Sequence, residues 1–172
     1  MIHNNEQNQE DGDDDDDDDD DDQDHEFLFG FGSIMNTSTH ASWFPSNPNG
    51  NGNTPGITSL PGTIATLSKE FGYERRWNFR SNTGFTALGV TTSGQGQEIN
   101  GVLFRVPRWM MPGFDRREVG YTKLAIPLEY LILDDSHPKC TRFENLSPQK
   151  SKIWWYVPDR CRSADEAHPL LQ

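Results

Sequence analysis

Ten consecutive aspartates at residues 13–22 divide this chain into two parts of different character. Residues 1–26 hold 15 of the 27 acidic residues and none of the 15 basic ones, so residues 27–172 hold 12 acidic and 15 basic residues. The net charge of -12 therefore arises in the first part, and the second part carries +3. Because adjacent carboxylates repel one another and bury no apolar surface, we expect residues 1–26 to form a disordered acidic tail.

The acidic tail restricts the partners that the chain can have. Its simplest role is to keep the protein in solution, and the alternatives are an electrostatic shield, a weak cation-binding tract or a decoy for basic partners. Calcium affinity would be poor because a flexible run offers no fixed cage of oxygen ligands. The tail would also repel phosphate groups, so we expect no nucleic-acid partner.

Apolar and cysteine content bear on location. No apolar run approaches the ~20 residues of a membrane span, and the N-terminus lacks the basic and apolar regions of a signal peptide. We therefore expect no membrane partner. Cys140 and Cys161 are too few to indicate a disulfide framework, which favours a reducing, cytoplasmic setting. His137 lies near Cys140 in "HPKC", but this is a weak zinc signal, and we expect no metal site.

The remainder of the chain is expected to be one domain over residues 27–172, made mostly of strands. Residues 99–107 alternate in hydrophobicity as a half-buried strand does. The other strand candidates, rich in β-branched and aromatic residues, are 27–31, 62–80, 84–92, 121–135 (interrupted or bulged at Pro127) and 152–158. Only 108–120 has helical character; Pro112 could start that helix, and Gly113 would weaken it. This order predicts an α+β fold: a small, partly closed antiparallel sheet or barrel with a few short helices.

The first of two candidate functional features is the turn "FGSI" at residues 31–34. A strand that ends in glycine and a hydroxyl residue often presents backbone N–H groups to a ligand. The alternative is that Gly32 is only a turn residue and Ser33 only a helix cap. No dinucleotide fingerprint, P-loop or G-x-S-x-G motif accompanies the turn, which excludes the common phosphate and hydrolase signatures.

The second feature is Glu118 in "FDRREVGY". Apolar neighbours such as Phe114 and Val119 would desolvate its carboxyl and raise its pKa towards neutrality, where it can take up and release protons. The alternative is that Glu118 pairs with Arg116 or Arg117, or simply faces solvent.

Several segments in this order resemble the gamma-glutamylcyclotransferase family: "FGFGSIM", "RRWNFR", "TALGV", "INGVLFRV" and "FDRREVGY". In that family a Tyr-Gly-Ser-aliphatic turn follows the first strand, here Phe31-Gly32-Ser33-Ile34. A Gly-Val strand, here Gly101-Val102, leads to a helix that ends in Asp-x-x-Glu, here Asp115 to Glu118. The resemblance covers residues 27 to about 130.

The resemblance implies an enzyme whose substrate is a small gamma-glutamyl compound, either glutathione or a gamma-glutamyl amino acid. The substrate's alpha-amine attacks its own gamma-carbonyl, and ring closure gives 5-oxoproline and a free amine without any cofactor. Glu118 is then the general acid and base, and the turn formed by Phe31, Gly32, Ser33 and Ile34 binds the glutamyl group.

Three departures from the family pattern bear on this expectation. Phe31 replaces the motif tyrosine and removes its hydroxyl, Pro112-Gly113 disrupts the helix before Glu118, and the end at "AHPLLQ" predicts a domain shortened at its C-terminus. A catalytically inactive relative that binds a small ligand or a protein is therefore the second hypothesis. A general interaction protein that acts through its acidic tail is the third.

Overall fold

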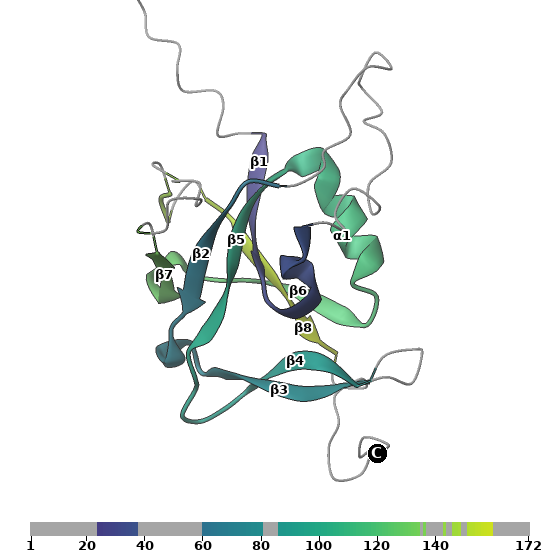
Figure 1. The fold of residues 1–172 in the computed structure, drawn as a ribbon, viewed down its shortest axis with the longest axis vertical. Helices are drawn as coiled ribbons and strands as arrows, with labels where there is room; N and C mark the ends of the chain where they lie inside the picture. The colour runs from purple at the N-terminus through teal and green to yellow at the C-terminus, as the bar shows by residue number, and fades with distance from the viewer. Residues whose placement is uncertain are drawn as a thin grey trace, which may run out of the picture.

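The computed structural model describes residues 24–37, 60–80, 86–134, 136, 143, 146–148 and 151–159. Within these ranges the strands β6, β8, β1, β5, β2 and β7, in that spatial order, form one sheet, and β3 and β4 form a separate hairpin (Figure 1). The elements in chain order are β1 (His25–Gly30), η2 (Gly32–Met35), β2 (Gly62–Leu67), η4 (Lys69–Phe71), β3 (Tyr73–Arg80), β4 (Thr86–Thr92), β5 (Ile99–Pro107), η5 (Arg108–Met110), α1 (Met111–Arg117), β6 (Tyr121–Ala125), η6 (Leu128–Tyr130), β7 (Leu131–Asp134) and β8 (Ile153–Pro158). The α+β class is confirmed.

The larger sheet is mixed and open, whereas the sequence led us to expect an antiparallel, partly closed sheet or barrel. β1 pairs with β5 in antiparallel fashion but with β8 in parallel, with Phe27 opposite Ile153. In the strand order β6 and β7 are the two edges, so the sheet does not close into a barrel. No local turn joins β1 to β8, and hydrophobic alternation does not encode the relative direction of two strands so distant in the chain.

The predicted strand 121–135 is two strands that lie on opposite edges of the sheet. β6 pairs with β8, and β7 pairs with β2. Pro127 separates them: it has no N–H to donate and starts the short 3-10 helix η6. The expected interruption at this proline is confirmed, and it redirects the chain across the sheet.

β1 starts at His25, so the last residues assigned to the acidic tail belong to the folded part. The Glu26 carboxylate accepts a hydrogen bond from the indole N–H of Trp154 at 2.7 Å and lies 3.8 Å from Arg108 Nε. Residues 1–23 of the predicted tail, the cysteines and the C-terminal end lie outside the described residues. No helix in the described ranges is both long and apolar enough to cross a membrane.

β1 supplies side chains to two separate hydrophobic clusters because successive residues of a strand face opposite sides. Phe27 and Phe29 pack in one cluster with Trp155 and with residues of the β3–β4 hairpin, and Phe31, directly after the strand, packs in the same cluster. Leu28 packs in the other with Phe104 and with residues of α1. The turn that follows β1 therefore lies between the hairpin and α1, where the pocket described next is found (Figure 1).

Candidate functional site

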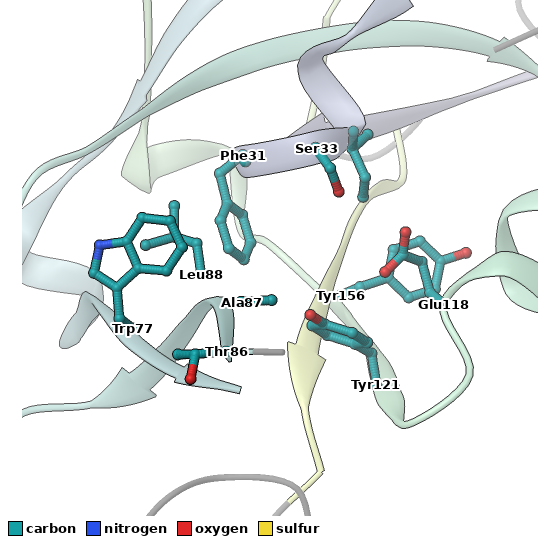
Figure 2. A pocket seen from close by; sticks show the side chains of 11 residues that line it. Phe31, Ser33, Trp77, Thr86, Ala87, Leu88, Glu118, Tyr121 and Tyr156 are labelled. Atoms are coloured by element: carbon teal, nitrogen blue, oxygen red, sulfur yellow. The ribbon is translucent and has the colours of Figure 1, made fainter. Parts of the chain in front are cut away.

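A pocket of about 370 Å³ opens beside the turn that follows β1. Three separate parts of the chain meet there: the turn itself, the β3–β4 hairpin, and the segments that contain Glu118, Tyr121 and Tyr156 (Figure 2). All the site residues predicted from the sequence line this pocket. The lining residues are Phe31, Gly32, Ser33, Ile34, Trp77, Thr86, Ala87, Leu88, Glu118, Tyr121 and Tyr156.

The turn owes its shape to Gly32, whose φ of +66° lies in the left-handed region that favours glycine. Phe31 is still extended, and the chain then enters the 3-10 helix η2 (Gly32–Met35). The first N–H groups of such a helix have no partner within it, which makes those of Gly32 and Ser33 candidate donors to a ligand. Ile34 is buried and fixes the turn against the second cluster.

Phe31 forms part of the pocket wall without offering a polar group. Its side chain is buried, and its ring meets that of Trp155 edge-on at 6.1 Å between centroids. The absence of a hydroxyl at this position is compatible with the apolar packing, and the Phe31 side chain can contact a ligand only through its ring.

Glu118 directly follows α1 and turns its carboxylate into the pocket (Figure 2). Its N–H donates to the Phe114 carbonyl at 2.9 Å, and its own carbonyl accepts from the Tyr121 N–H at 3.0 Å. These bonds hold the backbone on both sides of Glu118. As expected, Pro112 lies in the first turn of the helix, and Gly113 is buried without interrupting it. The helix therefore reaches Glu118 despite the Pro-Gly pair.

The Glu118 side chain is only 7% exposed, which rules out the solvent-facing alternative. Its Oε1 makes an ion pair with Arg117 Nη1, as the pairing alternative anticipated. That oxygen nevertheless accepts no well-aligned hydrogen bond from the part of the chain that the structure describes. An ionised carboxylate has about four acceptor sites, so the ion pair with Arg117 leaves it able to accept from a further N–H donor.

Arg117 links the two predicted features, a role that the sequence did not reveal. Its Nη2 donates to Ser33 Oγ at 2.8 Å, while its Nη1 contacts the Glu118 carboxylate. Burial lowers the pKa of Arg117, and the nearby Tyr121 opposes that shift. Arginine keeps its charge throughout the ordinary pH range, so the guanidinium stabilises the ionised form of the carboxylate beside it.

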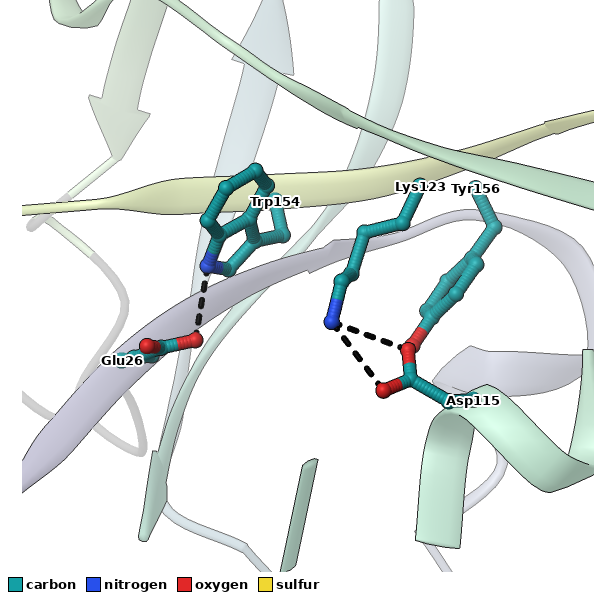
Figure 3. Close-up of polar contacts among 5 residues, drawn as sticks. All are labelled: Glu26, Asp115, Lys123, Trp154 and Tyr156. Atoms are coloured by element: carbon teal, nitrogen blue, oxygen red, sulfur yellow. Dashed lines mark hydrogen bonds and ion pairs between the residues drawn. The ribbon is translucent and has the colours of Figure 1, made fainter. Parts of the chain in front are cut away.

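Asp115, one turn before Glu118, fastens the helix to the sheet (Figure 3). Its Oδ1 accepts a hydrogen bond from the Tyr156 hydroxyl at 2.7 Å, and its two oxygens lie 2.9 and 3.1 Å from Lys123 Nζ. Burial and the Asp115 carboxylate raise the pKa of Tyr156, so its phenol stays protonated and keeps donating. Because Tyr156 also lines the pocket, this contact fixes the end of α1 relative to the pocket wall.

Tyr121 provides a hydroxyl inside the pocket, and nothing in the sequence singled this residue out (Figure 2). Its ring packs on Phe79 of β3 with 4.2 Å between centroids. Burial raises the pKa of Tyr121 to about 12, and the Arg117 guanidinium partly opposes the rise. At neutral pH the phenol is therefore a hydrogen-bond donor.

The raised pKa of Tyr121 gives an expected pH dependence of stability. Between about pH 10 and pH 12 the unfolded chain releases this phenolic proton while the native protein retains it, so the free energy of unfolding should fall as pH rises. In Tyr121→Phe the free energy of unfolding should fall less steeply with pH, because phenylalanine has no phenolic proton to release in either state. Urea midpoints at pH 9 and pH 11.5 for both proteins test this, and identical slopes would contradict it.

The hairpin side of the pocket was also missed. Trp77 lies on β3, and Ala87 and Leu88 lie on β4, more than 40 residues from the turn. "RRWNFR" and "TALGV" were recognised as segments of the family pattern, but alternation alone does not show that a separate hairpin folds over the turn.

Comparisons with known proteins give a likeness in fold only. No family model and no curated protein matches the chain. A protein of Arabidopsis thaliana whose solution structure is known is similar at 17% identity and a TM-score of 0.47, over 78% of this chain and 62% of that one. A structure named gamma-glutamyl cyclotransferase is similar at 13% identity and a TM-score of 0.47, over 78% of this chain and 67% of that one. A yeast gamma-glutamyl cyclotransferase specific to glutathione is similar at 12% identity and a TM-score of 0.43, over 78% and 69%.

Two of these three structures are named for the family that the motif residues resemble. The chain spans about three fifths of the length of the Arabidopsis protein. At such identities the similarity describes the fold, and a function for this chain has to be argued from the pocket and from the motif residues.

Proposed function

We propose that the chain is a gamma-glutamylcyclotransferase-like enzyme that converts a gamma-glutamyl amine or peptide into 5-oxoproline and a free amine. The observation that carries this proposal is the placement of the buried Glu118 carboxylate in one pocket with the Gly32-Ser33-Ile34 turn. Substrates of the family combine an ammonium group, a carboxylate and an amide carbonyl within one glutamyl group. The pocket offers an acceptor for the first and donors for the other two.

The proposed reaction needs one proton acceptor that later becomes a proton donor. Glu118 takes a proton from the substrate's alpha-ammonium group, and the resulting amine attacks the gamma-carbonyl carbon to form a C–N bond. The oxygen of the tetrahedral intermediate carries the negative charge. When the bond to the leaving nitrogen breaks, that nitrogen takes the proton from Glu118. The ring nitrogen then gives its extra proton to the regenerated carboxylate, which passes it to the released amine or to water.

The residues around Glu118 support both halves of this cycle. An ionised carboxylate has about four acceptor sites, so beside its ion pair with Arg117 the Glu118 side chain can still accept from an ammonium donor. Arg117 favours the ionised carboxylate at the start of the cycle. The N–H groups at the start of η2 and the Tyr121 hydroxyl are candidate donors to the substrate carboxylate and to the developing oxyanion. Holding the glutamyl chain curled for attack is mainly an effect of orientation.

A second candidate function is non-catalytic binding of a small ligand through the same pocket. The ion pair with Arg117 favours it, because this contact already occupies one side of the Glu118 carboxylate. The phenyl ring of Phe31 in place of a phenol favours it as well. In this alternative the pocket binds a gamma-glutamyl compound but releases it unchanged.

Replacement of Gly32 by valine is expected to raise the Michaelis constant about tenfold or more. A Cβ at this position would meet Leu88 only at 3.7 Å, an ordinary contact, so the damage comes from the φ of +66°, which a β-branched residue avoids. The turn would then lose the geometry that presents its N–H groups. Gly72→Val is the matched control, since Gly72 also has a positive φ of 79° but lies outside the pocket. It should lower stability and leave the Michaelis constant unchanged, and the same outcome for Gly32→Val would make the turn purely structural.

Ser33→Ala is expected to have a smaller effect than Gly32→Val. The backbone donors remain, and the variant loses only the hydroxyl that accepts from Arg117 at 2.8 Å. Because the Arg117 contact is internal to the protein, only a contact between the hydroxyl and the substrate can enter the Michaelis constant. One such hydrogen bond is worth about 0.5–1.5 kcal/mol, so the increase should be roughly two- to tenfold at most. Steady-state kinetics on well-folded protein measures this, and an effect larger than that of Gly32→Val would shift the binding role from the backbone to the hydroxyl.

A further inference from the structure

Trp77 is an unusual residue for its position on the β3–β4 hairpin. Its side chain is 68% exposed, whereas Phe79, two residues further along the same strand, is 5% exposed. The pairing of β3 with β4 shifts register between Arg76 and Phe79, so Trp77 lies in an irregular stretch of the strand. Such irregularities redirect side chains, and here the large indole lies at the pocket instead of in the core.

The pocket has two sides of different chemistry (Figure 2). On one side the indole of Trp77 lies beside Leu88, with Ala87 next to them on β4; we call these three residues the hairpin wall. The opposite side presents the Glu118 carboxylate, and the Tyr121 ring lies between the two sides with its hydroxyl directed towards Ala87. A ligand that fills the pocket would therefore have a polar end at Glu118 and an apolar end at the hairpin wall.

We infer that the hairpin wall is a subsite for the leaving amine and that it selects gamma-glutamyl amides of bulky apolar amines, with Trp77 as the specificity-determining residue. This inference rests on the function proposed above. If the glutamyl group is bound by the turn and Glu118, the leaving group extends away from them across the pocket. An aromatic or branched aliphatic group can then pack against the exposed indole, which provides a large apolar face at little cost in conformational entropy.

Two substrates that differ only in the leaving amine test this inference: the gamma-(2-phenylethyl)amide and the gamma-methylamide of L-glutamate. In the wild-type protein kcat/KM should be at least about tenfold higher for the phenylethylamide, and Trp77→Ala should reduce this preference about tenfold. Trp77→Phe should retain most of it. Ile132→Ala, which removes an exposed apolar side chain of β7 outside the pocket, should leave it unchanged. Because Trp77 is exposed, its replacement removes little core packing.

Dissociation constants of the same two amides for Glu118→Gln, measured by calorimetry, separate this inference from the proposed reaction. One outcome is that the wild-type protein forms no 5-oxoproline, but the phenylethylamide binds more tightly than the methylamide and Trp77→Ala removes the difference. In that case the subsite stands and the proposed reaction is wrong. If both amides are cyclised with equal efficiency, the reaction stands and the subsite is overturned. Equal affinities, a preference that survives Trp77→Ala, or no binding of either amide would also overturn it.

Discussion

Replacement of Glu118 by glutamine is expected to lower kcat by about 10²–10⁴-fold while the substrate dissociation constant changes by only a few-fold. Glutamine keeps the shape of the side chain and a carbonyl oxygen that accepts hydrogen bonds, but it cannot take up and return a proton. General acid–base catalysis by one positioned group is typically worth that factor. Single-turnover kinetics and calorimetry with the same gamma-glutamyl substrate measure the two quantities separately.

Glu74 offers a matched control for this experiment. It is a buried glutamate of β3 that pairs with Arg76 at 2.5 Å, and it does not line the pocket. Glu74→Gln therefore perturbs a similar ion pair and should leave kcat unchanged. A near-normal kcat in Glu118→Gln, or an equal loss in both variants, would remove Glu118 from the proton-transfer role.

Gly101→Ala is expected to give the largest loss of stability among glycine-to-alanine substitutions in the described sheet, about 3 kcal/mol or more. A Cβ on Gly101 would lie 2.4 Å from the carbonyl oxygen of Gly30 and 2.6 Å from the ring of Phe29. Both obstacles belong to β1, the strand that carries the turn, and a backbone carbonyl in a paired strand has little room to move. The melting temperature should fall by about 10 °C.

Gly94→Ala is the control for this substitution. Nothing lies within 4 Å of a Cβ at that position, and the backbone there needs no positive φ. Its melting temperature should stay within a degree or two of the wild-type value. A similarly small change in Gly101→Ala would show that β1 and β5 are less closely packed than the structure indicates.

The parts of the fold that depend on local pattern could be predicted from the sequence. Residues 99–107 alternate clearly, and β5 has those bounds. Pro127 was expected to interrupt its segment because a proline lacks an N–H, and it does so. Gly32 pointed to a turn because glycine readily adopts a positive φ, which it has here.

The features that depend on distant contacts could not be predicted in this way. β1 pairs with β8 in parallel, and β6 and β7 lie at opposite edges of the sheet. The sequence of a single segment does not encode its direction or position relative to a distant segment. The same holds for the site. Arg117 looked like one of two adjacent basic residues, and only the folded chain shows that its guanidinium contacts both Ser33 and Glu118.

The position of Trp77 at the pocket could not be predicted from the sequence either. In the sequence it reads as an ordinary aromatic strand residue, and a core position would be the usual expectation. The register shift after Arg76 and the approach of the hairpin to β8 place it at the pocket instead. Such a position depends on how two sheets pack, and a single strand pattern contains no information about it.

The proposed function is tested most directly by measuring 5-oxoproline in incubations of the purified full-length chain with glutathione, gamma-glutamyl-alanine and the gamma-(2-phenylethyl)amide of glutamate. Mass spectrometry should detect 5-oxoproline and the free amine in equal amounts from at least one substrate, at a rate proportional to wild-type enzyme and lost in Glu118→Gln. The same substrates in buffer alone correct for spontaneous cyclisation. Formation of 5-oxoproline no faster than in buffer, from all three substrates and with folded protein, would contradict the proposed reaction.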